Sequence, residues 1–202
     1  MKLYYFPGAC SLSPHIVAVE AGLSTGLEKV DLKTHKTESG GDYSKINPRG
    51  YVPALELDDG TMLFEGPAIA LYLADRKPAM KLAPAEGTPA RYQLISWLAF
   101  IGTEIHKQFA PMFQGGTDIE QVKAKKKIAA RFDYVNGELA GKTYLLGDDF
   151  TVADAYLFVM LTWATKTGID MPGNVKAYYT RIAKRPAVQQ ALASEGAQAK
   201  AA

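Results

Sequence analysis

The sequence predicts an α/β first half followed by an all-α second half. Short apolar and aromatic runs with the alternation of strands occur only up to residue 64. Two of these runs flank Asp58-Asp59-Gly60, whose glycine suits the left-handed position of a tight hairpin. From residue 89 onward, apolar residues recur with the 3.6-residue period of helices. With 202 residues, 48% of them hydrophobic, the chain can bury a proper core as one domain or two.

The first half begins with a strand and a short helix. Residues 2–6 are aromatic and predict a strand that ends at a Pro-Gly turn. Residues 14–22 predict a helix, with Ser13 as the N-cap, Pro14 at the first helical position and Gly22 as a left-handed cap.

The rest of the first half completes a small mixed sheet. Residues 27–32 predict a second strand, and 34–50 are polar and turn-rich, with room for one helical turn. Residues 51–57 and 61–64 predict the hairpin, and residues 67–75 a helix opened by proline. This order of elements is the thioredoxin-like arrangement.

Composition predicts two domains with a linker between them. We expect a thioredoxin-like domain over 1–78, a Pro-rich linker over 79–88 and an all-helical domain over 89–202. The expected helices of the second domain are 89–113, 118–140, 152–167, 173–184 and 187–194.

Bulk charge and cysteine content exclude several function classes. The 23 basic and 21 acidic residues nearly cancel, so neither nucleic acid nor a membrane surface is the expected partner. The longest apolar run, 155–164, is about half the length of a membrane span and predicts a buried helix. One cysteine and three scattered histidines give no metal site and no internal disulfide. The start lacks a secretion signal, so the expected location is cytoplasmic.

Cys10 is the first candidate for chemistry. It lies between the first strand and a helix start, whose partial positive charge favours a thiolate. Ser13 stands where dithiol proteins carry a second cysteine, so an external thiol such as glutathione would have to resolve a mixed disulfide. The alternative is a small buried hydrophobic residue.

Two further segments of the first domain are suited to bind a peptide-like ligand. Val52-Pro53 begins a strand, and a cis bond there would turn the Val52 backbone N–H and C=O toward such a ligand. Glu65 and Gly66 precede a helix whose N–H groups can bind a carboxylate while Glu65 takes an ammonium. The alternatives are an ordinary edge proline and a carboxylate that complements the helix dipole.

The helix over 89–113 carries the candidates of the second domain. Ala99, Thr103 and His106 follow i, i+4, i+7 spacing and share one face. Glu104 points roughly 160° away from His106, so the two would serve different sites or subunits. The alternative for His106 is a hydrogen-bonded structural histidine.

Five motifs together resemble the beta-class glutathione transferases of bacteria, over essentially the whole chain. They are KLYYFPGACSLSPHI, NPRGYVPAL, LFEGPAIALYLAD, WLAFIGTEIHK and FTVADAYLF. The resemblance implies the glutathione transferase fold, glutathione as co-substrate without a metal, a hydrophobic co-substrate pocket in the helical domain, a homodimer and a role in detoxification.

The resemblance also implies roles for individual residues. Cys10 would contact the glutathione sulfur, and His106 would approach that sulfur from the helical domain. Glu104 would reach the glutathione of the neighbouring subunit. The implied glutathione-binding residues are Cys10, His35, Val52, Pro53, Glu65, Gly66, Ala99, Thr103, Glu104 and His106.

Three positions depart from the family pattern. Many members carry Lys at His35, Asn at Ala99 and Ser at Gly66, so weaker glutathione binding is expected. His35 lacks a full positive charge at neutral pH, which adjacent Lys36 can compensate.

Conjugation is the main functional hypothesis. Glutathione binds as a thiolate beside Cys10 and His106 and attacks an electrophilic carbon of a small apolar substrate. A mixed disulfide at Cys10 would add thiol-disulfide exchange or peroxidase activity. The alternatives are a non-catalytic protein that sequesters apolar ligands and a glutathione-dependent ring-opening or isomerising enzyme.

Overall fold

The computed structural model describes residues 1–196, which form two compact units. Unit 1 contains Met1–Ala83 and the segment that begins at Arg185, and unit 2 contains Pro84–Lys184. The sequence assigns everything after residue 89 to one helical domain. The structure instead groups α9 (Pro186–Ser194) with unit 1, because this helix packs on α1 (Leu12–Glu20).

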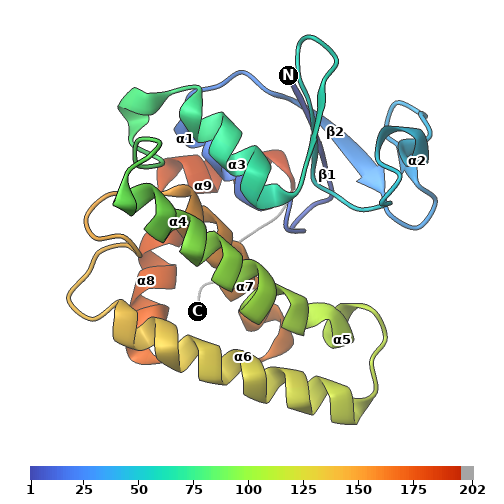
Figure 1. Ribbon diagram of the computed structural model, residues 1–202. Helices are drawn as coiled ribbons and strands as arrows, with labels where there is room; N and C mark the ends of the chain where they lie inside the picture. Colours follow the sequence, from blue (N-terminus) through green and yellow to red (C-terminus); the bar gives the residue numbers. More distant parts are fainter. Residues whose placement is uncertain (197–202) are drawn as a thin grey trace. The chain divides into compact units, whose positions relative to one another are not determined.

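Unit 1 is built on a five-stranded mixed sheet, as the thioredoxin-like arrangement requires (Figure 1). The spatial order is β3-β2-β1-β4-β5, with β1 parallel to β2 and the remaining neighbours antiparallel. The strands are β1 (Lys2–Tyr5), β2 (Gly26–Asp31), β3 (Lys36–Thr37), β4 (Ala54–Glu56) and β5 (Met62–Phe64). The sequence missed β3, because two residues are too short to show a period.

The helices of unit 1 match the predicted order. They are α1, α2 (Tyr43–Ile46), α3 (Gly66–Asp75) and the 3-10 turn η1 (Pro78–Met80), with α9 added. Gly22 ends α1 at φ 61°, and Leu23 N–H returns to the Ala18 carbonyl at 3.0 Å, as a left-handed cap requires. The predicted N-cap Ser13 is wrong: α1 starts two residues earlier and Ser11 is the N-cap.

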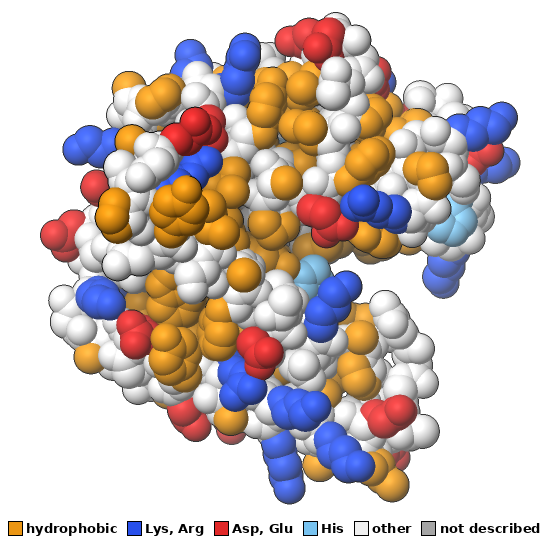
Figure 2. Space-filling view, viewed as in Figure 1, with side chains coloured by type: hydrophobic (Ala, Val, Ile, Leu, Met, Phe, Trp, Pro, Cys, Tyr) orange, Lys and Arg blue, Asp and Glu red, His pale blue; other side chains and the backbone are white. Residues whose placement is uncertain are grey.

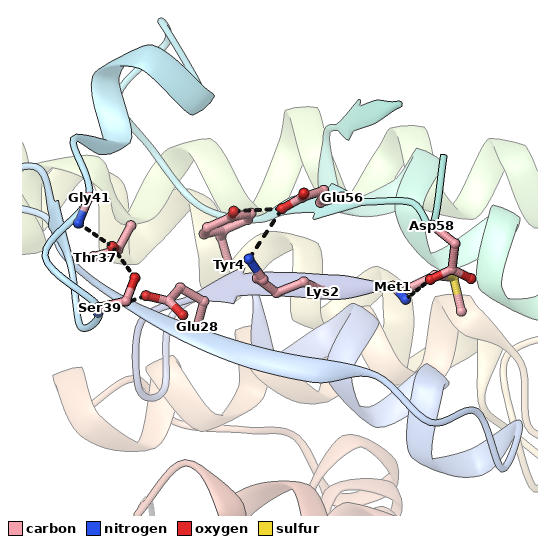
Figure 3. A network of polar contacts seen from close by, with 9 residues as sticks. All are labelled: Met1, Lys2, Tyr4, Glu28, Thr37, Ser39, Gly41, Glu56 and Asp58. Carbon is pink, nitrogen blue, oxygen red and sulfur yellow. Dashed lines mark hydrogen bonds and ion pairs between the residues drawn. The ribbon is translucent and has the colours of Figure 1, made fainter. Parts of the chain in front are cut away.

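A polar network ties the first strand to its neighbour (Figure 3). Glu56 of β4 accepts a hydrogen bond from Tyr4 Oη at 2.7 Å and lies 3.4 Å from the Lys2 ammonium. The amino group of Met1 pairs with Asp58, which follows β4. The Tyr4 hydroxyl therefore links β1 to β4.

Tyr43 is the largest fully buried side chain of the core beside the sheet. Its hydroxyl donates to the Tyr51 carbonyl at 3.0 Å. Burial raises the pKa of Tyr43 to about 12. The buried residues packed together here are Tyr4, Val30, Tyr43, Val52 and Ala54.

The raised pKa predicts loss of stability in alkali. Above pH ~10 the unfolded chain ionises Tyr43 while the folded protein keeps its proton, so the free energy of unfolding falls as pH rises from ~10 to ~12. A shift of about two pKa units corresponds to about 2 to 3 kcal/mol. Urea unfolding at several pH values should show a shallower decline for Tyr43→Phe. A Tyr92→Phe variant, at a side chain that is 65% exposed, should keep the wild-type decline. Equal declines in all three proteins would contradict the prediction.

Unit 2 is all-helical, but its first helix is not continuous. The sequence predicts one helix over 89–113, whereas the structure divides that segment into four pieces. They are α4 (Pro89–Phe100), the π turn η2 (Ile101–Ile105), the 3-10 turn η3 (His106–Phe109) and α5 (Ala110–Phe113). The prediction of a regular helix is therefore wrong here, because apolar periodicity does not register a change of hydrogen-bond pattern.

The other helices of unit 2 confirm the sequence prediction closely. They are α6 (Asp118–Glu138), α7 (Val152–Thr167) and α8 (Gly173–Ala183). The apolar run 155–164 is buried within α7, as expected. Among the described residues, no helix combines the length and apolarity needed to cross a membrane.

Candidate active site

Cys10 lies in the turn between β1 and α1. It directly precedes Ser11, the N-cap of α1, and its carbonyl accepts from Ser13 N–H at 3.1 Å. The side chain is half-buried, and Sγ donates to the Val52 carbonyl at 3.3 Å. The fold thus brings the thiol to the backbone of a residue far away in sequence.

The Val52-Pro53 peptide bond is cis, which is one of the two alternatives that the sequence leaves open for this dipeptide. The whole Val52 residue is only 3% exposed, and its carbonyl meets Cys10 Sγ. On the other side, a methyl group added to Gly66 would lie 3.6 Å from Pro53 Cγ. Cys10, Val52, Pro53 and Gly66 are therefore consecutive neighbours within unit 1.

Glu65 occupies a strained backbone position at the start of α3. Its φ of 67° is unusual for a residue with a Cβ atom, and such strain clusters at functional sites. The carboxylate Oε1 accepts from Arg49 Nη1 at 2.8 Å and from Tyr51 Oη at 2.9 Å. The Glu65 side chain is 56% exposed, so it is accessible to a ligand cation.

His35 also has a left-handed backbone, with φ 52°. Its ring packs against Gly50, since a methyl group added there would lie 3.2 Å from His35 Cε1. Among the described residues, the buried Nδ1 atom has no hydrogen-bond partner. The His35 ring is therefore held against Gly50, which lies two residues before Val52, and one polar atom of the ring is unsatisfied.

His106 belongs to an aromatic cluster in unit 2. Its Nδ1 lies 2.6 Å from Tyr156 Oη, and its ring meets the Trp163 ring edge-on with the ring centroids 5.0 Å apart. Trp163 also packs edge-on against Phe109 and Phe113. One polar imidazole is thus placed among apolar rings, a combination suited to orient an apolar substrate.

Of the other candidates of unit 2, Glu104 contacts a different helix from His106. Thr103 Oγ1 donates to the Ala99 carbonyl at 3.0 Å, so these two remain neighbours along the helix. Glu104 Oε2 instead accepts from Arg131 of α6, from Nε at 2.9 Å and Nη2 at 2.7 Å. Glu104 therefore faces α6 while His106 faces α7, as the sequence argument expects.

Glu104 and Arg131 border a groove of about 740 Å³ between α4 and α6. Three aromatic residues, Trp97, Phe100 and Tyr134, line the groove, and their ring centroids lie 5.3 to 6.0 Å apart. Figure 2 shows hydrophobic side chains on this face, with acidic and basic side chains beside them. No group of three or more His, Cys, Asp or Glu residues within residues 1–196 is arranged to hold a metal.

Comparison with known proteins decides the family. The model of the "Glutathione S-transferase, N-terminal domain" matches residues 8–76, and that of the "Glutathione S-transferase, C-terminal domain" matches residues 98–186. The chain belongs to the glutathione S-transferase family.

This transferase is similar to named transferases and to solved transferase structures, one of them with glutathione bound. Glutathione S-transferase GstA of Escherichia coli O157:H7 is 44% identical over 199 residues, covering 97% of this chain and 99% of the relative. The beta-class transferase of Sphingomonas chungbukensis has a TM-score of 0.94 and 49% identity, covering 97% of this chain and 99% of that chain. A sphingomonad transferase complexed with glutathione has a TM-score of 0.94, 48% identity and the same coverage. The protein is therefore an enzyme, a glutathione S-transferase of the bacterial beta type.

Four side chains that contact the candidate residues of the transferase were missed by the sequence analysis. Arg49 and Tyr51 bind Glu65, Arg131 binds Glu104, and Tyr156 binds His106. Tyr51 stands next to Val52 in sequence, and this proximity was the only available signal. Arg49 lies in the same loop as Tyr51, whereas Arg131 and Tyr156 belong to α6 and α7, and only the fold brings these two near Glu104 and His106.

Proposed function

We propose that the transferase holds glutathione on unit 1 at Cys10, Val52, Pro53, Glu65 and Gly66, and joins it through its sulfur to small hydrophobic electrophiles. The observation that carries this proposal is the 3.3 Å contact between Cys10 Sγ and the Val52 carbonyl. It puts the single thiol of the chain beside a backbone group suited to pair with a peptide.

Each end of glutathione has a complementary group in unit 1. The γ-glutamyl ammonium suits the exposed Glu65 carboxylate, and the γ-glutamyl carboxylate suits the N–H groups at the start of α3 around Gly66. The backbone of the central cysteinyl residue of glutathione can pair by hydrogen bonds with the Val52 backbone. The glycyl carboxylate can accept hydrogen bonds from His35 and Lys36, whose side chains carry N–H donors.

Conjugation forms one bond and breaks another. The glutathione thiolate attacks the electrophilic carbon, a carbon–sulfur bond forms, and the leaving group departs with its electron pair. For His106 we keep the role that the resemblance implies, at the glutathione sulfur, with Ala99 and Thr103 as further contacts. The rings around His106 would receive the apolar substrate.

Thiol-disulfide exchange is the second reaction that Cys10 supports. The Cys10 thiolate attacks a glutathione mixed disulfide, joins its sulfur to that of glutathione and releases the other thiolate. A second glutathione thiolate then attacks the glutathione sulfur, which gives oxidised glutathione and regenerates the Cys10 thiolate. We propose that this chemistry takes place in the cytoplasm, where glutathione is reduced and abundant. Its proposed role is detoxification.

Intact mass spectrometry tests the site directly. The protein is incubated with oxidised glutathione at mildly acidic pH, where an ordinary thiol is slow, and then with reduced glutathione. We expect one adduct at Cys10 that reduced glutathione removes, and none in Cys10→Ser. Conjugation is measured in parallel with Cys10→Ala and His106→Ala. Unchanged turnover in both would show that these residues are wrongly assigned.

Gly66→Ser is expected to strengthen glutathione binding. A Cβ atom at Gly66 would make only ordinary contacts, at 3.6 and 4.0 Å from Pro53 ring atoms. The added hydroxyl can hydrogen-bond the γ-glutamyl carboxylate, worth a roughly 2- to 10-fold decrease in KM for glutathione. Gly66→Ala adds the carbon without the hydroxyl and should leave KM unchanged. Equal KM values for the Ser and Ala variants would exclude the contact.

We also propose that the transferase forms a homodimer through the groove between α4 and α6. The aromatic residues that line this groove are of the kind enriched in protein interfaces. Glu104 and Arg131 place a negative and a positive charge on the same face, so two copies related by a two-fold axis can pair opposite charges. Glu104 at this face fits the implied role toward the neighbouring subunit's glutathione. Light scattering should give twice the mass of one chain, and Tyr134→Glu should give monomers. Tyr92→Glu, outside the groove lining, should remain dimeric; a dimeric Tyr134→Glu variant would move the interface elsewhere.

A further inference from the structure

A buried tyrosine of α7 contacts one nitrogen of the His106 ring. His106 Nδ1 lies 2.6 Å from Tyr156 Oη, and the planes of the two rings are 84° apart. Tyr156 is 5% exposed, whereas His106 is half-buried. A methyl group added to Gly102 would lie 3.6 Å from the same hydroxyl. The Tyr156 hydroxyl therefore lies against the π turn η2 as well as against the imidazole.

The tyrosine belongs to a helix that is buried along most of its length. All residues of α7 from 152 to 164 are buried. Tyr156 and Trp163 are seven residues apart, so they share one face of this helix. The Trp163 ring meets the His106 ring edge-on. Two side chains of one helix face thus restrain the imidazole, one through an apolar contact and the other through a polar contact.

His106 stands where the helical hydrogen-bond pattern changes. It is the C-cap of η2 and the first residue of the 3-10 turn η3. A π turn holds one extra residue, which rotates the side chains after it by about 100° around the helix axis. The direction of the His106 ring is therefore not that of a regular helix, and its contacts with α7 help to set it.

The contact with Tyr156 also determines which nitrogen of the neutral imidazole carries the proton. A phenol hydroxyl is a stronger acid than a neutral imidazole N–H, and an imidazole nitrogen is a stronger acceptor than a phenol oxygen. The hydroxyl therefore donates to Nδ1. A neutral imidazole has a single N–H, so its proton then resides on Nε2.

We propose that Tyr156 is a positioning residue that orients the His106 ring and keeps its neutral form protonated at Nε2. The inference rests on the proposed function in one respect, that His106 acts at the glutathione sulfur. There the Nε2–H can donate a hydrogen bond to the thiolate, whereas an Nε2 lone pair would repel it. Tyr156 acts through His106 and has no contact of its own with the sulfur in this scheme.

Tyr179 provides a matched control within unit 2. It is 1% exposed, and its ring stacks on that of Phe158 of α7. Within residues 1–196, its buried hydroxyl has no hydrogen-bond partner. Tyr179→Phe therefore makes the same chemical change as Tyr156→Phe at another buried position, without removing a hydrogen bond.

NMR of the ring nitrogens tests the proposal in the protein without glutathione. At pH about 8.5 an imidazole of ordinary pKa is neutral, and a His106→Asn variant identifies the signals. In the wild type, Nδ1 should show the chemical shift of an acceptor and Nε2 that of an N–H. Tyr156→Phe should move the two shifts toward each other, because both tautomers are then populated. Tyr179→Phe should leave both shifts unchanged.

Turnover measures the consequence for the reaction. Tyr156→Phe should lower kcat about 5- to 50-fold, because the group at the sulfur is no longer held in one orientation and tautomer. Its KM for glutathione should change by less than about 2-fold, since the imidazole affects the reacting sulfur more than the rest of the ligand. Tyr179→Phe should keep the wild-type kcat and KM.

Two results would overturn the proposal. One is an N–H at Nδ1 in the wild type. The other is a Tyr156→Phe variant that matches Tyr179→Phe in its ring shifts, or in kcat while His106→Ala is slow. If Tyr156→Phe does not fold, the wild-type tautomer decides, because the proposal requires an acceptor at Nδ1. Unchanged turnover in His106→Ala, with the expected ring shifts intact, would instead reject the function proposed for His106.

Discussion

Asp154→Ala is expected to lower the free energy of unfolding of unit 2 by about 3–5 kcal/mol, since it removes a buried carboxyl group that satisfies several hydrogen-bond donors. Asp154 is fully buried near the start of α7. Its carboxylate accepts from the Thr151 N–H and Oγ, from Leu145 N–H and from Tyr178 Oη at 2.7 to 2.9 Å. Burial raises the pKa of this carboxyl, and the hydrogen bonds oppose the rise. One residue therefore joins α7 to α8 and to the preceding loop.

The second capping box of unit 2 provides the control for this prediction. Glu120 in the first turn of α6 accepts from Thr117 N–H at 2.8 Å, but this site is exposed to solvent. Glu120→Ala should therefore cost much less stability than Asp154→Ala. Urea unfolding is followed by fluorescence, because both tryptophans of the chain, Trp97 and Trp163, lie in unit 2. Equal losses in the two variants would show that the buried contacts of Asp154 contribute nothing beyond an ordinary cap.

Glu65→Ala is expected to raise KM for glutathione about 10- to 100-fold, the loss of one charge-assisted hydrogen bond. The alanine keeps its Cβ, so the strain of the left-handed backbone at φ 67° is unchanged. The ion pair with Arg49 is exposed on both sides, so its loss alters the free energy of unfolding by at most about 1 kcal/mol. The effect on KM therefore reports the contact with the ligand.

Two variants separate this contact from general effects on unit 1. Arg49→Gln removes the same ion pair but keeps the Glu65 carboxylate, so KM should change far less than in Glu65→Ala. Glu56→Ala removes a carboxylate from the sheet network and should leave KM unchanged. Initial rates at varied glutathione, with the electrophile saturating, give KM. A Glu65→Ala variant with the wild-type KM would remove Glu65 from the proposed site.

Local sequence patterns determined the order and type of most elements. The hairpin at Gly60, the left-handed cap at Gly22 and the buried α7 follow from turn chemistry and apolar period, which act between residues close in sequence. The cis bond before Pro53 was also anticipated as one alternative, because the cis form is only slightly less stable than the trans form before proline. These signals need no knowledge of distant contacts.

The tertiary structure alone decided which distant groups meet at the candidate site. No pattern in the sequence pairs Cys10 with the Val52 carbonyl, Glu65 with Arg49, or Gly8 with Glu195. The π turn at Ile101–Ile105 was likewise invisible, since a helical period persists when one turn changes its hydrogen bonds. The physical reason is the same in each case. Local preferences act on the dihedral angles of single residues and can be read from short stretches of sequence. Packing decides which distant side chains are buried against one another, and that choice depends on the whole fold.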